Sequence, residues 1–250
     1  MLASPRTLVG RMLRWPLRFV PAMRPVRILS GPLRGKRWLS TSGTHGCWIG
    51  TYERDLQRLL AASLKPGDVF FDIGANVGFF SLLGASLVEP TGHVYAFEPF
   101  PRNVGLLERN LALNEVANVT IFPAAVADTE GWGNLGSASS PSQNSLGSEG
   151  LRVSLVSLDA LSSAGRLSDP SAMKIDVEGA ESRVLAGARR MLERCRPLIF
   201  LSTHGHEQHD QCWQYLQALG YRLRLRRDGV QDGQYESIAE HPLRKDTSRT

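Results

Sequence analysis

The chain has 250 residues, 42% of them hydrophobic, and a formal net charge of +5. It has no apolar run near the ~20 residues of a membrane-spanning helix. The three cysteines, Cys47, Cys195 and Cys212, are far apart and form no CxxC pair, which argues against disulfides and a zinc knuckle. We therefore expect a cytoplasmic protein with one sizeable core.

The positive charge is concentrated at the N-terminus. Residues 1–52 hold nine basic residues and no acidic one, whereas the rest holds 20 basic and 24 acidic residues, a net charge of −4. The acidic body argues against nucleic acid as a partner. One interpretation of residues 1–25 is a segment that contacts an anionic membrane at its inner face, with Leu13, Trp15 and Phe19 toward the acyl chains. The other is a loosely ordered terminus or a partner-docking arm.

The pattern along the chain predicts an α/β fold. Residues 26–50 indicate a short β addition, and we place the main domain at 51–245, beginning with a helix over 51–64. Strands and helices then alternate, which predicts a doubly wound, mostly parallel sheet. The expected strands are 68–74, 93–99, 118–128, 172–177 and 197–203, the expected helices are 77–88, 102–114 and 178–195, and the expected closing antiparallel pair is 221–227 with 234–240.

A segment rich in glycine and serine, residues 129–150, interrupts this alternation. It predicts a long polar loop with weak strands at its edges. Loops of this length in a compact domain are typically lids or disordered inserts, and the composition leaves both interpretations open.

The stretch "FFDIGANVGFF" (70–80) predicts a strand end, a tight turn and a helix start that together hold a cofactor. The dinucleotide pattern G-x-G-x-x-G fails here at two of its three positions. The S-adenosylmethionine pattern acid-x-G-x-G-x-G matches Asp72, Gly74 and Gly78, with Asn76 at the middle glycine. A carboxylate repels a pyrophosphate but attracts the ammonium and sulfonium groups of S-adenosylmethionine. We therefore expect Asp72 to face that cofactor and the glycines to allow its close approach.

Two further acids are candidates for the cofactor site. Glu98 ends the second strand, 20 residues after Gly78, where an acid accepts hydrogen bonds from ribose hydroxyls of either type of cofactor. Asp128 follows the third strand, where it is a candidate acceptor for the adenine amine. A turn-forming role explains Asp128 equally well.

The motif "KIDVEGAE" at the fourth strand predicts the reactive end of the site. In a doubly wound sheet the first and fourth strands are neighbours at the switch point, where ligands bind. Asp176 and Glu178 would then stand beside the cofactor, with Lys174 on the same side of the strand as Asp176. The alternative is structural, because carboxylates in the first turn of a helix are favoured by its dipole.

At these residues the sequence resembles the FkbM-type methyltransferases, a branch of the class I S-adenosylmethionine-dependent enzymes. The matching text is "DIGANVGFFSL", "AFEPFPRN", "LERNLALN", "AAVAD", "KIDVEGAESRVLAGA" and "RPLIFLSTHG". The resemblance implies a seven-stranded, Rossmann-like sheet and O-methylation of a sugar or another small hydroxylated metabolite. It implies cofactor-binding roles for Asp72, Gly74, Asn76, Gly78 and Glu98, and active-site roles for Asp176 and Glu178. Family members often have a glutamate where this chain has Ser202, which makes His204 a substitute candidate.

Transfer to a neutral hydroxyl requires that its proton be removed. Asp176 or His204 as a base is the first interpretation. A divalent cation held by Asp176, Glu178 and His204 is the second and ranks below it. We expect His204, His206 and His209 to lie in a polar loop rather than to form a metal site. Two other classes remain as alternatives: a nicotinamide-dependent oxidoreductase and a non-catalytic, membrane-associated binding module.

Overall fold

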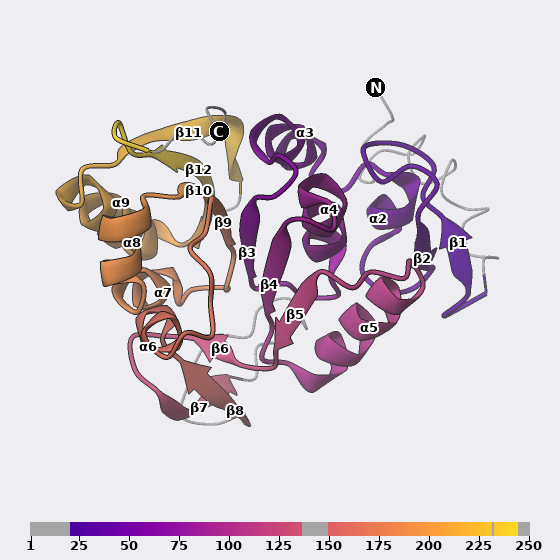
Figure 1. Cartoon of the computed structure of the whole chain (residues 1–250), viewed down its shortest axis with the longest axis horizontal. Coiled ribbons are helices and arrows are strands. Elements are labelled where there is room, and N and C mark those ends of the chain that lie inside the picture. Colours follow the sequence, from indigo (N-terminus) through magenta and orange to yellow (C-terminus); the bar gives the residue numbers. More distant parts are fainter. Residues whose placement is uncertain (1–20, 137–149, 232, 245–250) are drawn as a thin grey trace.

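In the computed structural model, which describes residues 21–136, 150–231 and 233–244, a seven-stranded sheet lies between two layers of helices (Figure 1). Its strand order is β11-β12-β10-β9-β3-β4-β5, and β12 runs antiparallel to both of its neighbours. The strands are β3 (Val69–Ile73), β4 (His93–Phe97), β5 (Val119–Phe122), β9 (Ala172–Ile175), β10 (Leu198–His204), β11 (Arg222–Gln231) and β12 (Gln234–Glu240). The predicted doubly wound, mostly parallel fold with a closing antiparallel pair is confirmed.

Both faces of this sheet are covered because its central strands are apolar on both sides. Phe70 packs with helices on one face, while Phe71 and Ile73 pack with helices on the other. The first layer consists of α3 (Arg54–Ser63), α4 (Phe79–Val88) and α5 (Pro101–Ala112). The second consists of α6 (Leu158–Ser163), α7 (Glu181–Ala186), α8 (Arg189–Cys195) and α9 (His206–Ala218).

The prediction of one helix over 178–195 is wrong, because the segment forms the separate helices α7 and α8. Between them, Gly187 packs against the main chain of Ala127. A Cβ atom at position 187 would lie 2.0 Å from the Ala127 carbonyl oxygen. The break at Gly187 therefore allows the two helices to pack closely against the segment around Ala127. The local sequence pattern does not reveal this contact.

A second, three-stranded sheet with the order β6-β8-β7 occupies part of the expected polar loop. Its strands are β6 (Ala125–Val126), β7 (Gly131–Gly136) and β8 (Gly150–Val156). The expected strand over 118–128 is consequently divided between two sheets, β5 in one and β6 in the other. Residues 137–149 lie outside the described residues, so the choice between a lid and a disordered insert stays open.

The N-terminal addition contains the antiparallel pair β1 (Pro25–Arg27) and β2 (Arg37–Leu39), followed by α2 (His45–Ile49), which the sequence did not predict. Buried Asn110 of α5 joins this addition to the main domain. Its side chain accepts a hydrogen bond from Leu39 N (3.1 Å) and donates one to Val77 O (2.9 Å). Residues 1–20 are not described, and so the membrane interpretation stays a prediction. Within the described ranges, the chain has no helix long and apolar enough to cross a membrane.

Candidate active site

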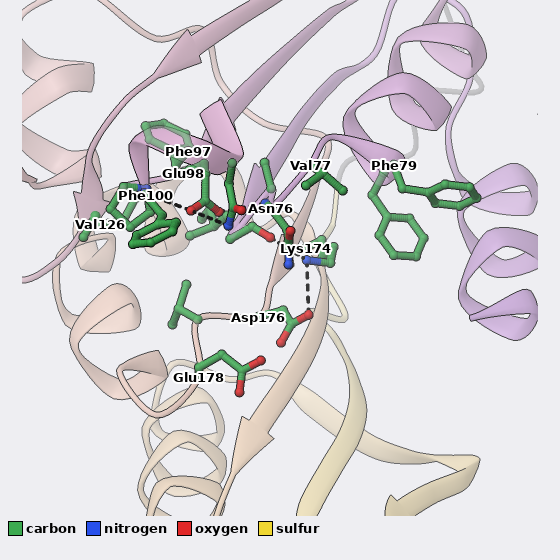
Figure 2. Close-up of a pocket in the computed structure, with 18 of the residues that line it drawn as sticks. Asn76, Val77, Phe79, Phe97, Glu98, Phe100, Val126, Lys174, Asp176 and Glu178 are labelled. Carbon is green, nitrogen blue, oxygen red and sulfur yellow. Dashed lines mark hydrogen bonds and ion pairs between the residues drawn. The ribbon is translucent and has the colours of Figure 1, made fainter. Parts of the chain in front are cut away.

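A cavity of about 260 Å³ lies at the carboxyl ends of the central strands (Figure 2). The loops that follow β3, β4, β5 and β9 all contribute to its walls. Carboxyl ends of neighbouring parallel strands meet at one edge of a sheet, and ligands bind where the strand order reverses. In this protein that point lies between β3 and β9. The segments that line the cavity include 73–77, 97–100, 124–126 and 176–178.

The loop after β3 has positive φ at three positions, which explains its composition. Gly74 (φ 79°) and Gly78 (φ 88°) have the left-handed backbone that glycine adopts without penalty. Asn76 (φ 49°) shares it, and asparagine is among the few other residues that tolerate it. A Cβ atom at Gly74 would lie 1.8 Å from the carbonyl oxygen of Asp176. Gly74 therefore brings the cofactor loop against the segment that holds the candidate catalytic acids.

Glu98 lies at one end of the cavity and is held by the loops around it. Its Oε2 accepts a hydrogen bond from Asn76 N (2.8 Å), and its Oε1 accepts from Phe100 N (2.9 Å) and Asn103 Nδ2 (3.3 Å). Burial raises the pKa of Glu98, and these hydrogen bonds oppose the effect. A carboxylate has about four lone-pair sites, and the three hydrogen bonds to Glu98 leave Oε2 able to accept one more; Glu98 is among the residues that line the cavity.

Asp72 is placed differently from the expectation that it faces the cofactor. It is fully buried and is not among the residues that line the cavity. Its Oδ2 accepts a hydrogen bond from Ser81 Oγ (2.6 Å), and its Oδ1 lies 3.6 Å from Lys174 Nζ. The charge of Asp72 is therefore matched by Lys174, which itself lines the cavity.

Lys174 is the residue of the site whose role sequence reasoning left undefined. Its buried Nζ lies between Asp72 (3.6 Å) and Asp176 Oδ2 (3.4 Å) and donates a hydrogen bond to Gly74 O (3.2 Å). Burial alone would lower its pKa, but the charges of Asp176 and Asp72 outweigh burial and raise it. One sign of this role is present in the sequence, because Lys174 on β9 and Asp176 directly after β9 are two residues apart and are expected on the same side. The structure adds that Asp72 and Lys174 are register partners on the neighbouring strands β3 and β9, so that the lysine lies between two carboxylates.

The expectation that Asp128 reaches the adenine is not supported by its position. Asp128 is half-exposed, does not line the cavity and forms an ion pair with Arg183 (2.7 Å). Instead, the residues that line the cavity include the apolar side chains of Phe100, Val126 and Leu135. Sequence reasoning missed Leu135 because it reaches the cavity through the second sheet.

The opposite end of the cavity from Glu98 is acidic. Asp176 and Glu178 follow β9, and Figure 2 shows Glu178 across the cavity from Glu98. His204 ends β10, with its Nε2 3.3 Å from Glu178 Oε2 and 3.8 Å from Asp176 Oδ1. The structure thus brings together the three residues predicted to be catalytic.

The ionisation of this end reflects burial and the clustering of charges. Burial raises the pKa of Glu178 to about 7, assisted by Asp176 and opposed by His204. Burial by itself would lower the pKa of His204, but the hydrogen bond to Glu181 and the charges of Glu178 and Asp176 raise it to about 9. An imidazole with this pKa is mostly protonated at neutral pH, when it has no free lone pair with which to accept a proton.

The two other histidines of the "STHGHEQHD" stretch lie in helix α9, and the expectation of a polar loop there is wrong. His206 contacts the hydroxyl of Tyr235, and the ring of His209 stacks on the Tyr235 ring with centroids 4.2 Å apart. These contacts direct both side chains toward β12. Among the described residues, the group able to surround a metal ion is Asp176, Glu178 and His204.

Comparison with known proteins agrees with the fold and identifies the family of the chain. The sequence matches the methyltransferase FkbM domain over residues 72–223. The chain therefore belongs to the FkbM methyltransferase family, and the nicotinamide alternative is set aside.

Two curated relatives illustrate the similarity. The chain is 30% identical over 146 residues to the hexuronic acid methyltransferase AglP of Haloferax volcanii, covering 56% of this chain and 58% of AglP. It is 44% identical over 68 residues to the 31-O-demethyl-FK506 methyltransferase FkbM of Streptomyces tacrolimicus, covering 27% of this chain and 25% of that protein. The chain thus matches under two thirds of the length of either relative.

Solved structures share the fold at low sequence identity. The methyltransferase FkbM from Methylobacillus flagellatus has a TM-score of 0.54 at 15% identity, covering 80% of this chain and 56% of that chain. A precorrin-6y C5,15-methyltransferase from Geobacter metallireducens has a TM-score of 0.52 at 18% identity, covering 75% of this chain and 88% of that chain. Both similarities concern the fold alone.

Proposed function

We propose that the protein transfers a methyl group from S-adenosylmethionine to a hydroxyl oxygen of a sugar or another small hydroxylated metabolite. The observation that carries the proposal is a single cavity with Glu98 at one end and Asp176 and Glu178 at the other. An excess of carboxylates attracts a donor that carries a sulfonium and an ammonium group. The names of the two relatives, a hexuronic acid methyltransferase and a 31-O-demethyl-FK506 methyltransferase, support an acceptor of this class.

We assign different parts of the cofactor to different residues of the cavity. Glu98 keeps an acceptor position for a ribose hydroxyl, and the apolar wall with Phe100 and Val126 suits an adenine ring. Gly74 and Asn76 also line the cavity, and we assign the cofactor's amino-acid part to this segment. When bound, S-adenosylmethionine supplies a methyl group activated by its positive sulfur.

We assign positioning of the acceptor and removal of its proton to the residues at the acidic end of the cavity. The protein must hold the acceptor hydroxyl in line with the methyl group and exclude water. With the donor bound, the hydroxyl oxygen would bond to the methyl carbon and lose its proton, and the S–C bond would break with its electron pair left on sulfur. Asp176, Glu178 and His204, with Nε2 of His204 3.8 Å from Asp176 and 3.3 Å from Glu178, are our candidates for receiving that proton.

Calorimetry with three ligands tests the cofactor assignment. We expect saturable binding of S-adenosylmethionine and S-adenosylhomocysteine and none of NAD; binding of NAD alone would contradict the proposal. A panel of sugars and polyols with the labelled donor then tests the acceptor class. Asp176→Asn should retain cofactor affinity and lose most turnover, whereas the charge-matched control Asp55→Asn, exposed on α3, should leave both unchanged.

A further inference from the structure

Asp176, Glu178 and His204 have the spacing of a set of metal ligands. One ligand atom from each, two carboxylate oxygens and an imidazole nitrogen, lie within 4.8 Å of one another. Two ligands of one cation, each about 2.1–2.3 Å from it, lie roughly 3.0–4.6 Å apart. Shifts of a few tenths of an ångström would therefore close the set around an ion. All three side chains are partly accessible, and Asp176 and Glu178 line the cavity, so that an ion between them would have room for water or an acceptor oxygen as further ligands.

A fourth residue, Glu181, orients the ring of His204 for metal binding. Glu181 is fully buried, and its Oε1 lies 2.8 Å from His204 Nδ1 and also accepts a hydrogen bond from Gly179 N (2.9 Å). Its Oε2 is buried without a hydrogen-bond partner among the described residues. Histidines that bind metals almost always donate their second ring N–H to a group such as a carboxylate, which fixes the ring and its tautomer. Glu181 thus directs the Nε2 of His204 toward Asp176 and Glu178.

The charge balance of this region also favours a cation. Lys174 is shared between Asp72 and Asp176, and its Nζ lies on the Oδ2 side of Asp176. The Oδ1 of Asp176 faces His204 instead. The carboxylates of Asp72, Asp176, Glu178 and Glu181 are therefore arranged around Lys174 and His204. A neighbouring cavity adds Glu53, Glu236 and Arg226, and Arg226 is paired with Glu236 (2.8 Å), so that acids remain in excess.

We propose that Asp176, Glu178 and His204 bind one divalent cation at the acceptor end of the cavity, with Glu181 as the positioning residue behind His204. Carboxylate oxygens suit Mg²⁺ and Mn²⁺, and the imidazole nitrogen shifts the preference from Mg²⁺ toward a transition metal such as Mn²⁺. The role of the ion rests on the proposed function: it would bind the acceptor hydroxyl and lower its pKa so that the proton leaves before or during methyl transfer. Binding of the ion itself does not depend on that function.

Titration of the 250-residue chain with Mn²⁺, followed by electron paramagnetic resonance, measures the binding directly. We expect one Mn²⁺ per chain, with affinity lowered at least tenfold by Asp176→Asn, Glu178→Gln and His204→Gln. Glu181→Gln keeps the side-chain shape and should lower the affinity roughly 10- to 100-fold. The matched control is Glu207→Gln, which removes an exposed acid three residues after His204 and should change nothing.

Spin-echo spectroscopy of the wild-type complex tests the ligand set without relying on any variant's folding. Coupling to an imidazole nitrogen is expected in the wild type and should disappear in His204→Gln. Absence of saturable Mn²⁺ binding at millimolar concentrations, absence of nitrogen coupling, or equal binding by wild type and the three ligand variants would each overturn the site.

Measurements with a chelator separate this inference from the proposed function. We expect EDTA to abolish methyl transfer, Mn²⁺ to restore it, and S-adenosylmethionine to bind in both conditions. Undiminished transfer in EDTA would overturn the role of the ion and leave the methyltransferase assignment intact. If Mn²⁺ binds but S-adenosylmethionine does not, the proposed function would be overturned and the cation site would stand.

Discussion

Gly74 lies directly against the main chain of Asp176, so that a Cβ atom at position 74 would fall 1.8 Å from the Asp176 carbonyl oxygen. Gly74→Ala should therefore displace the cofactor loop or the acidic end. The alanine would also hold a positive φ, which costs roughly 1–2 kcal/mol. We expect the free energy of unfolding to fall by more than that amount and affinity for S-adenosylmethionine to fall with it, measured by urea denaturation and calorimetry.

Gly105→Ala is the matched control for this substitution. Gly105 lies within α5, and a Cβ atom there would meet no atom within 4 Å. An alanine at such a helix position stabilises a protein by about 0.4–1 kcal/mol. Equal effects of the two substitutions would contradict the close approach at Gly74.

Removal of the buried lysine should be strongly destabilising. Lys174→Met leaves Asp72 without its ion-pair partner in a fully buried position, and breaking a buried pair in this way costs about 3–5 kcal/mol. The double variant Asp72→Asn with Lys174→Met removes both charges and should recover part of the loss. Denaturation of the wild type, both single variants and the double variant gives the coupling energy, and strict additivity would show that the two charges do not interact.

Glu98→Gln tests the cofactor end. The glutamine loses a negative charge and presents donors toward the backbone N–H groups of Asn76 and Phe100, which now donate to Glu98. Hydrogen bonds to charged groups contribute about 1.5–3 kcal/mol, and we therefore expect roughly 10- to 100-fold weaker binding of S-adenosylmethionine by calorimetry. Glu108→Gln, at an exposed position of α5, is the control and should bind normally. Unchanged affinity in Glu98→Gln would remove Glu98 from the cofactor site.

The pH dependence of stability should report on Glu53, which lines a small neighbouring cavity with Asp176 and Arg226. Burial and the charge of Asp176 raise the pKa of Glu53 from 4.5 to about 7. The folded state therefore binds more protons than the unfolded state between these pH values, and the free energy of unfolding falls as pH rises from 4.5 to 7. One such group contributes a slope of at most about 1.4 kcal/mol per pH unit.

Urea denaturation of Glu53→Gln at pH 5, 6, 7 and 8 tests this expectation. The decline between pH 5 and 7 should become shallower but not vanish, because the pKa of Glu178 is raised into the same range. The slope above pH 7 should change little, since the raised pKa of His204, about 9, governs that range. An unaltered slope between pH 5 and 7 would show that Glu53 does not titrate there.

The local pattern predicted the strands and the cofactor loop well because both depend on short-range rules. Short apolar runs define the central strands, and the positive φ at Gly74, Asn76 and Gly78 favours the residue types found there. Asp72 and Asp128 were harder to place, because an acid at a strand end can face a ligand or an ion-pair partner. Asp72 forms an ion pair with Lys174 and Asp128 forms one with Arg183. Each partner is distant in the sequence.

By itself, the sequence determined the alternation of strands and helices, the FkbM resemblance and the positions of Glu98, Asp176 and Glu178 at strand ends. Only the tertiary structure decided which charges meet. The break at Gly187 and the contact of His204 with buried Glu181 arise from packing between distant segments. The physical reason is that backbone conformation follows from neighbouring residues, whereas the environment of a charge follows from everything that folds around it.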